Sequence, residues 1–308
     1  MTRDEYNIDL PEYFPPLHIP ANNQLTNKKI KLGERLFNDI NISIDSTIMC
    51  ASCHKRELAF ADSLSISPGV QGKLGDRNSP SLINAAFSPL INKDGGVTKL
   101  DIQALIPIED HNEMGISIIE LSKRLADDQE YSDLFRQAFD QDPNGFTIPR
   151  AFSSYVRSLV DNSSMYDEFL QGDSNALSDS AERGMKLFFS DDLACSNCHN
   201  GPLLTSFEFG NNGLYEEYND LGRALITLDS LDHGKFRIPS LRNVSLTAPY
   251  MHNGSIPTLE RVIDHYASGG LSHTSKSQFI KGFKISHGQK SDLLGFLNAL
   301  TSQDFKNI

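Results

Sequence analysis

The pentapeptide Cys50-Ala51-Ser52-Cys53-His54 has a second copy of the same pattern, Cys195-Ser196-Asn197-Cys198-His199. Together the two copies use all four cysteines of the 308-residue chain. A C-x-x-C-H string is typical of covalent c-type haem attachment, in which both thiols add to the vinyl groups of the haem and the histidine binds the iron. We therefore predict two c-type haems. Their predicted protein ligands are the thiols of Cys50, Cys53, Cys195 and Cys198 and the imidazoles of His54 and His199.

Other uses of paired cysteines fit this pattern less well. A thioredoxin-like C-x-x-C needs a βαβ setting, which neither motif has. A disulfide or a structural zinc site would not require a histidine directly after each second cysteine. The position of the histidines therefore favours haem.

Length and charge limit the class of protein. A chain of 308 residues can form two domains of ordinary size. The net charge of -12 argues against nucleic acid and anionic membrane surfaces as partners, and favours a basic protein. No apolar run approaches the roughly 18 to 20 residues of a membrane span. Because covalent haem attachment takes place outside the bacterial cytoplasm, we expect a periplasmic protein whose export signal is absent from this chain.

A longer internal repeat predicts two related domains. The segment Gly33-Glu34-Arg35-Leu36-Phe37 precedes the first motif as Gly184-Met185-Lys186-Leu187-Phe188 precedes the second. Apolar spacing predicts helices at these segments and closing helices near the end of each copy, whereas strand signals are sparse. The expected fold class is mainly α, with each domain built around one covalent haem. The expected helices span residues 26–39, 148–159, 180–189 and 291–300. The expected divisions are an N-terminal arm at 1–25, a first haem domain at 26–162 and a second at 163–308, with a polar linker over 162–178.

The open axial side of each haem decides between electron transfer and catalysis. No histidine occurs between His54 and His111, so we expect the first iron to keep an open side, as peroxide chemistry requires. Glu113 is the candidate group for moving a proton between the peroxide oxygens, with Gln103 as a hydrogen-bonding neighbour. The ordinary alternative for Glu113 is a solvated surface carboxylate.

Several further segments make the chain resemble the bacterial dihaem cytochrome c peroxidases and their MauG-type relatives. The resemblance spans about residues 26–302. Besides the two haem motifs, it depends on Arg77-Asn78-Ser79-Pro80-Ser81-Leu82 with Asn84-Ala85, on Gln103 with Pro107 and Glu113-Met114, on Pro239-Ser240-Leu241-Arg242-Asn243, and on Ala248-Pro249-Tyr250-Met251-His252-Asn253-Gly254 with Thr258-Leu259.

The resemblance implies two cytochrome c-like domains with unequal haems. It assigns a peroxidatic haem to His54, an electron-transfer haem to His199 and the acid–base role to Glu113, with Gln103 lining the same pocket. It also implies a calcium ion between the domains, since hard oxygen ligands suit calcium. The implied calcium ligands are the side chain of Asn78 and the backbone carbonyls of Thr247 and Pro249.

The distal ligand of the second haem separates the subclasses. The position that carries a methionine in the cytochrome peroxidases falls on Tyr266, which is the MauG-type choice. A phenolate ligand stabilises ferric iron, whereas a thioether raises the reduction potential. Met251 and His265 are competing ligands, and a plain core aromatic is the alternative role for Tyr266.

The chain also departs from the family pattern. The family usually has a Phe-Trp-Asp-Gly-Arg string between the haems, and the matching segment here is Asn92-Lys93-Asp94-Gly95-Gly96 in a chain without tryptophan. Electron exchange between the haems must then use Tyr, Phe or direct tunnelling. The removable distal histidine of the first haem is also missing, so we expect the all-ferric protein to bind peroxide directly.

The leading functional prediction is reduction of hydrogen peroxide to water at the first haem, with electrons relayed through the second. The donor would be a protein such as a small cytochrome or a copper protein. One alternative is MauG-like oxidation of a partner protein's side chain, and another is a non-catalytic dihaem electron-transfer cytochrome. The sequence does not decide the oligomeric state, and a homodimer is one option.

Overall fold

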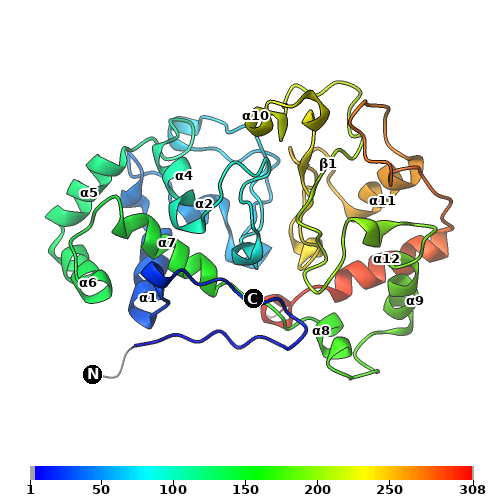
Figure 1. The fold of residues 1–308 in the computed structure, drawn as a ribbon, viewed down its shortest axis with the longest axis horizontal. Coiled ribbons are helices and arrows are strands. Elements are labelled where there is room, and N and C mark those ends of the chain that lie inside the picture. Colours follow the sequence, from blue (N-terminus) through cyan, green and yellow to red (C-terminus); the bar gives the residue numbers. More distant parts are fainter. Residues whose placement is uncertain (1–3, 307–308) are drawn as a thin grey trace.

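The computed structural model describes residues 4–306, which form two helical halves side by side (Figure 1). The mainly α fold class is confirmed. One two-stranded antiparallel sheet occurs in the described part, formed by β1 (Phe209–Gly210) and β2 (Phe236–Arg237). The α-helices of the first half are α1 (Asn27–Phe37), α2 (Cys50–Cys53), α3 (Leu100–Gln103), α4 (Leu105–Glu109), α5 (Ile118–Asp127), α6 (Gln129–Phe139) and α7 (Thr147–Ser158). Those of the second half are α8 (Met165–Leu170), α9 (Asp179–Phe188), α10 (Ala224–Thr227), α11 (Leu259–Ser268), α12 (His287–Ala299) and α13 (Gln303–Lys306).

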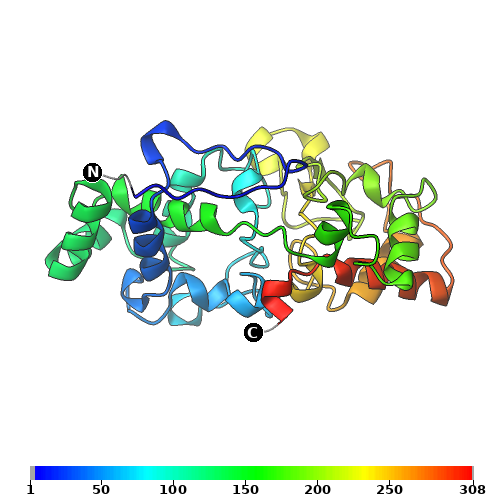
Figure 2. The ribbon, with the colours of Figure 1, turned by 90° about the horizontal axis from the view of Figure 1, so that it is seen from below.

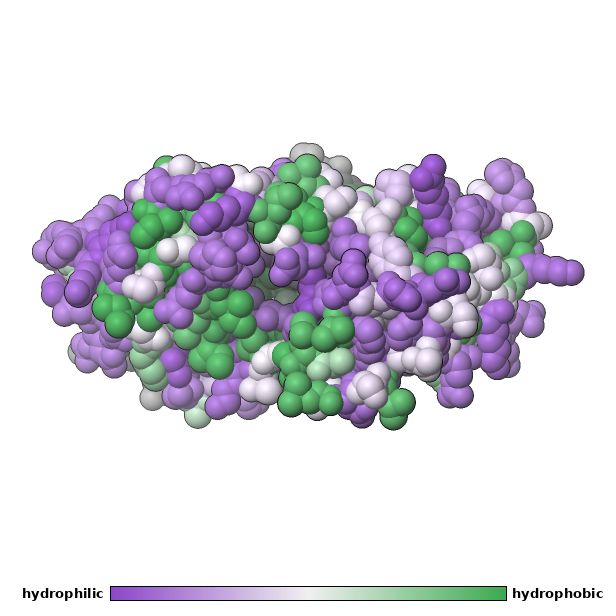
Figure 3. All heavy atoms as spheres, turned by 90° about the horizontal axis from the view of Figure 1, so that it is seen from above, coloured by the Kyte–Doolittle hydropathy of each residue, from purple (hydrophilic) through white to green (hydrophobic). Residues whose placement is uncertain are grey.

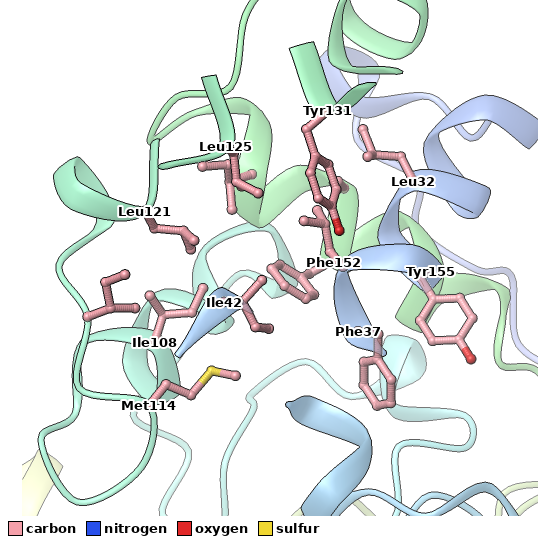
Figure 4. Packing of buried hydrophobic residues seen from close by; sticks show 14 of the residues in the cluster. Leu32, Phe37, Ile42, Ile108, Met114, Leu121, Leu125, Tyr131, Phe152 and Tyr155 are labelled. Carbon is pink, nitrogen blue, oxygen red and sulfur yellow. The ribbon is translucent and has the colours of Figure 1, made fainter. Parts of the chain in front are cut away.

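Each half has its own apolar core. The first core lies between α1, α5, α6 and α7, where Phe37 and Tyr155 meet edge to face at 5.2 Å between ring centroids (Figure 4). The second core lies around α9 and α12, where Phe188 and Phe296 have centroids 5.3 Å apart. Two separate clusters agree with a duplicated unit.

The four helices predicted from apolar spacing all form, as α1, α7, α9 and α12. The duplicated glycine lies where each pair of helices crosses. A methyl group on Gly33 of α1 would overlap the Ala151 carbonyl oxygen of α7, and one on Gly184 of α9 would overlap the Asp292 carbonyl oxygen of α12. A glycine therefore allows the close backbone approach in both halves.

The N-terminal segment lies along both halves, as Figure 2 shows for the dark blue chain. Tyr13 donates its hydroxyl hydrogen to Asp167 Oδ1 at 3.0 Å in the second half. Phe14 is buried, with Phe87 of the first half 5.8 Å from its ring centroid and the Arg242 guanidinium of the second half 4.8 Å away. The predicted arm is thus anchored by a buried aromatic ring.

The predicted polar linker contains a helix. Residues 162–178 include α8, whose Asp167 is fully buried and forms an ion pair with the buried Arg242, with oxygen–nitrogen distances of 2.6 and 2.7 Å. Ser164 begins the helix by accepting a hydrogen bond from the Asp167 backbone. The polar residues of the predicted linker thus form a helix cap and a buried ion pair, which polarity alone does not show.

The face of the molecule drawn in Figure 3 is largely hydrophilic. Seen from above, apolar residues form separate patches between hydrophilic ones (Figure 3). Exposed apolar side chains include Leu225 and Ile226 of α10. Within residues 4–306 no helix has the length and apolar character needed to cross a membrane.

Candidate functional site

Both C-x-x-C-H motifs form a single helical turn. The first forms α2 and the second a 3-10 turn over Cys195–Asn197, and each ends with the histidine backbone N–H donating to the carbonyl of the first cysteine, at 3.0 Å for His54 and 2.9 Å for His199. The four thiols are free of disulfides. Burial raises the pKa of Cys50 and of Cys195 to about 12, so both are protonated at neutral pH.

The two histidines are prepared as iron ligands. Nδ1 of His54 donates to the Phe60 carbonyl at 2.9 Å, and Nδ1 of His199 lies 3.2 Å from the Leu204 carbonyl and 3.1 Å from that of Pro239. Burial lowers the pKa of His54 and takes that of His199 to about 4, so both rings are neutral. A Nδ1 hydrogen bond of this kind fixes the tautomer and leaves the Nε2 lone pair for a metal. The thiols and imidazoles therefore fit two c-type haems.

A Pro-Ser-Leu-x-Asn segment packs against each haem motif. The first copy is at 80–84 and the second at 239–243. In both copies the serine hydroxyl donates a hydrogen bond to a backbone carbonyl in the chain that follows the motif. The proline carbonyl accepts a hydrogen bond from the ligand histidine. The asparagine backbone N–H donates to the carbonyl at the end of the closing helix. The matching bonds are Ser81 Oγ to Ala59 O and Ser240 Oγ to Leu203 O, both 2.6 Å, with Asn84 N to Leu159 O at 2.9 Å and Asn243 N to Leu300 O at 3.0 Å. In the sequence, these segments pointed to the family resemblance alone, although the pattern that they share also reveals the repeat.

Glu113 lies close enough to the first motif for its charge to act on Cys50 and Cys53. Its loop is held in place by the Val70 N–H, which donates to the Glu113 carbonyl at 2.8 Å. Burial and, to a lesser degree, Asp110 raise the pKa of Glu113, although the residue as a whole is exposed at the surface. The structure thus brings the predicted acid–base group to the first motif.

The contacts of His111 and Gln103 do not place either residue beside the first motif. The His111 side chain is 82% exposed beside Asp110, so it is a surface group. Gln103 ends α3, and its amide donates to Asn92 Oδ1 at 3.5 Å. Gln103 therefore lies beside the 92–96 segment, and its role in the pocket stays a prediction.

Tyr266 is in α11 and lies close enough to the second motif to interact electrostatically with Cys195 and Cys198. Burial raises the pKa of its phenol to about 12. The two competing ligands are both engaged by Asn212, whose side chain donates to Met251 Sδ at 3.0 Å and whose carbonyl bonds His265 Nε2 at 3.0 Å. Because the Asn212 side chain also interacts with the Tyr266 phenol, these contacts do not separate the three residues, and Tyr266 as the distal ligand stays a prediction.

One of the predicted calcium ligands, Asn78, lies at the junction of the halves. Asn78 is buried, its backbone N–H donates to the His252 carbonyl at 3.0 Å and its side-chain nitrogen to the Leu64 carbonyl at 3.1 Å. The amide oxygen of Asn78 is therefore the atom available to a cation. In residues 4–306 no group of three or more His, Cys, Asp or Glu could hold a metal, and calcium at Asn78, Thr247 and Pro249 stays a prediction.

The same junction contains a half-buried lysine where the family has its tryptophan-containing string. Lys93 Nζ lies 3.5 Å from the Met251 carbonyl, and burial, with Arg237 and Arg77 nearby, lowers the pKa of Lys93 to about 7. Arg77 joins the halves by bonding Asp94 at 2.6 Å and Asp220 at 2.7 Å. The sequence shows only that tryptophan is missing from this segment; the charged cluster could not be predicted from it.

Comparison with known proteins agrees with this geometry. A model of the di-haem cytochrome c peroxidases matches residues 27–175, and a RoxA-like, cytochrome c-like model matches residues 236–267. Cytochrome-c peroxidase IdrP1 of Pseudomonas sp. (strain SCT) is 35% identical over 325 residues, covering 94% of this chain and 85% of that one. Methylamine utilization protein MauG of Methylophilus methylotrophus is 35% identical over 288 residues, covering 91% and 84%. The crystal structure of a MauG-like protein associated with microbial copper homeostasis superposes with a TM-score of 0.92 at 34% identity, covering 97% of each chain.

Fold and motifs define the class as dihaem c-type cytochromes with two cytochrome c-like domains. Within that class, the chain belongs to the di-haem cytochrome c peroxidase and MauG family. Its cofactors are therefore two haems, and it is an oxidoreductase of the peroxidase type.

Proposed function

We propose that this protein takes oxidising equivalents from hydrogen peroxide at the His54 site and uses them, through the His199 site, to oxidise a partner protein in the manner of MauG. The observation that carries the proposal is the difference between the two distal sides. Glu113 lies beside the first motif, and Tyr266 lies beside the second. The similarity to MauG and to a MauG-like structure supports the same choice.

The proposed chemistry assigns separate tasks to the protein side chains. Haem bound at Cys50, Cys53 and His54 would supply the iron at which the peroxide O–O bond is cleaved. Glu113 takes the proton from one peroxide oxygen and returns it to the other, so that water can leave. A carboxyl whose pKa is raised by burial can hold that proton more readily than an ordinary surface glutamate can.

Turnover of peroxide with an electron-donor protein is the second candidate, as the sequence first suggested. It is favoured by the relatives named cytochrome-c peroxidase, including one from Escherichia coli that is 34% identical over 260 residues. The donor would be a small cytochrome or a copper protein. The same relatives weaken the third prediction, a non-catalytic carrier.

Three other predictions belong to this proposal. Calcium at Asn78, Thr247 and Pro249 would tie the halves together, and the buried position of Asn78 supports it. A periplasmic location is supported by the need to attach haem outside the cytoplasm. The domain divisions at 1–25, 26–162 and 163–308 are supported by the two separate apolar cores.

The two enzymatic candidates are separated by adding hydrogen peroxide to the ferric protein with and without a reduced small cytochrome. An oxidised state that persists without the cytochrome and supports few turnovers with it agrees with oxidation of a partner protein. Rapid repeated turnover with the cytochrome would favour the second candidate. A ferric protein whose haem spectra do not respond to peroxide would contradict both.

A further inference from the structure

Two tyrosines in ring contact, Tyr215 and Tyr218, lie between the region of the predicted distal ligand of the second haem and a surface pocket. The pocket has a volume of about 370 Å³ and is lined by Tyr215, Tyr218, Glu217, Asp220, His252 and Asn253, among others. Tyr218 is buried at its inner end, whereas Tyr215 is only partly buried. The two tyrosine rings meet edge to face with centroids 5.5 Å apart.

The inner tyrosine is linked to Tyr266 through two adjacent asparagines. Tyr218 donates its hydroxyl hydrogen to Asn211 Oδ1 at 2.9 Å, and the next residue, Asn212, interacts through its side chain with the Tyr266 phenol. Tyr218 and Tyr266 are also near enough to interact electrostatically. The order from the second haem site outward is therefore Tyr266, Tyr218, Tyr215 and the pocket.

The amino-acid composition favours tyrosine as the residue type that carries an electron through this protein. The chain contains nine tyrosines and no tryptophan, so a phenol is the most easily oxidised aromatic ring available. Electron tunnelling slows steeply with distance, and rings in near contact replace one long step by short ones. The route needs no residue from the segment where the family has its tryptophan.

We propose that Tyr215 and Tyr218 carry electrons from a partner protein docked at this pocket to the second haem site. This inference rests on the proposed function, which supplies the oxidant. Tyr215 loses one electron inward and its hydroxyl proton to solvent in the pocket, and it regains both when the partner gives up an electron. Two such cycles, with two protons from solvent, reduce one hydrogen peroxide to two waters and oxidise the partner by two electrons.

The surroundings of Tyr215 suit this step and indicate the partner's charge. Tyr215 Oη accepts a hydrogen bond from Asn253 Nδ2 at 2.8 Å, which leaves its own hydroxyl hydrogen free to be donated. The exposed carboxylates of Asp76 and Glu217 line the same pocket. Together with the net charge of -12, they favour a partner that presents basic side chains around its oxidisable group.

The test compares Tyr215→Phe and Tyr218→Phe with a matched control, Tyr166→Phe. Tyr166 is equally buried in the second half but packs against Phe296 in the core, away from the pocket. Each holoprotein is mixed with hydrogen peroxide, and the haem spectra report the first reaction. Reduced small basic cytochrome is then added in an amount that allows only a single turnover, and the rate of that one oxidation is measured, together with radical signals by electron paramagnetic resonance.

We expect all four proteins to react equally with peroxide, whereas oxidation of the cytochrome slows by an order of magnitude or more in the two pocket variants alone. We also expect Glu217→Lys to slow the cytochrome reaction and weaken its salt dependence. Equal cytochrome rates in all variants would overturn the relay. Loss of the peroxide reaction itself in wild type would instead count against the proposed function.

Discussion

Single residues make the two haem motifs unequal. The ligand cysteines and histidines could be predicted from spacing alone, because the chemistry of c-type haem needs them within one turn. Glu113 and Tyr266 could not be assigned from the residue pattern, since a lone acid or tyrosine has many ordinary roles; only the family resemblance singled them out. The structure brings each of them near its expected motif.

Replacing Glu113 by Gln tests the proton-transfer role. The amide keeps the size of the side chain but cannot exchange a proton, so we expect the reaction of the ferric protein with peroxide to slow by about 10² to 10⁴-fold. Stopped-flow absorbance of the haems measures this rate. Glu109→Gln is the matched control on α4, since its carboxylate accepts a hydrogen bond from the Ile118 backbone N–H at 3.1 Å, which an amide oxygen can also accept, so the rate should be unchanged. An unchanged rate in Glu113→Gln would rule out this role.

The buried Asp167–Arg242 pair predicts a pH-dependent stability. Burial alone would raise the pKa of Asp167, but hydrogen bonds from Arg242 and Ser164 lower it below 3.8. The stabilisation is therefore fully present above pH 3.8 and is lost as the pH falls through the lower, folded-state pKa.

Asp167→Ala leaves Arg242 buried without its partner, so we expect the free energy of unfolding to fall by about 3–5 kcal/mol at neutral pH. Urea denaturation measures it, and the difference from wild type should shrink in acid. Asp133→Ala, which removes an exposed ion pair with Arg136, should change little. Equal losses of unfolding free energy in the two variants would show that the buried pair stabilises the protein no more than the exposed pair does.

Secondary-structure elements repeat in the two halves more closely than the sequence suggests at first sight. Apolar spacing predicted the paired helices α1 with α7 and α9 with α12, because one face of each helix faces a core. The Pro-Ser-Leu-x-Asn segments have no regular period, so their shared role behind the ligand histidines was found only in the structure. Helix α8 was likewise found only in the structure, because the polar residues that cap it and form its buried ion pair look like a linker in the sequence.

The helix crossing in the second half predicts an unusual response to alanine. Alanine favours an exposed helix over glycine by about 1 kcal/mol, but a methyl group on Gly184 would overlap the Asp292 backbone. We expect Gly184→Ala to lower the free energy of unfolding by about 1–3 kcal/mol. Gly288→Ala on α12, where the added methyl meets no atom within 4 Å, should be neutral or stabilising. Thermal unfolding of both variants measures this, and a stabilised Gly184→Ala would contradict the close crossing.

The whole molecule is a duplicated haem domain held together at one junction. The arm contacts both halves through Tyr13 and Phe14, and Arg77 connects Asp94 with Asp220 across the junction. Class, repeat and haem sites could be predicted because local patterns encode them. The junction could not, because Tyr13 and Asp167, like Arg77 and Asp220, are more than a hundred residues apart in the sequence and only the fold brings them together.

The central claim is that the second iron is closed by Tyr266 while the first stays open. Electron paramagnetic resonance of the ferric protein tests it most directly, in wild type, Tyr266→Phe and the control Tyr250→Phe. We predict one high-spin signal from the first haem in all three proteins, and a second signal that changes only in Tyr266→Phe. Two six-coordinate low-spin signals in wild type, or a Tyr266→Phe spectrum identical to that of wild type, would contradict the account.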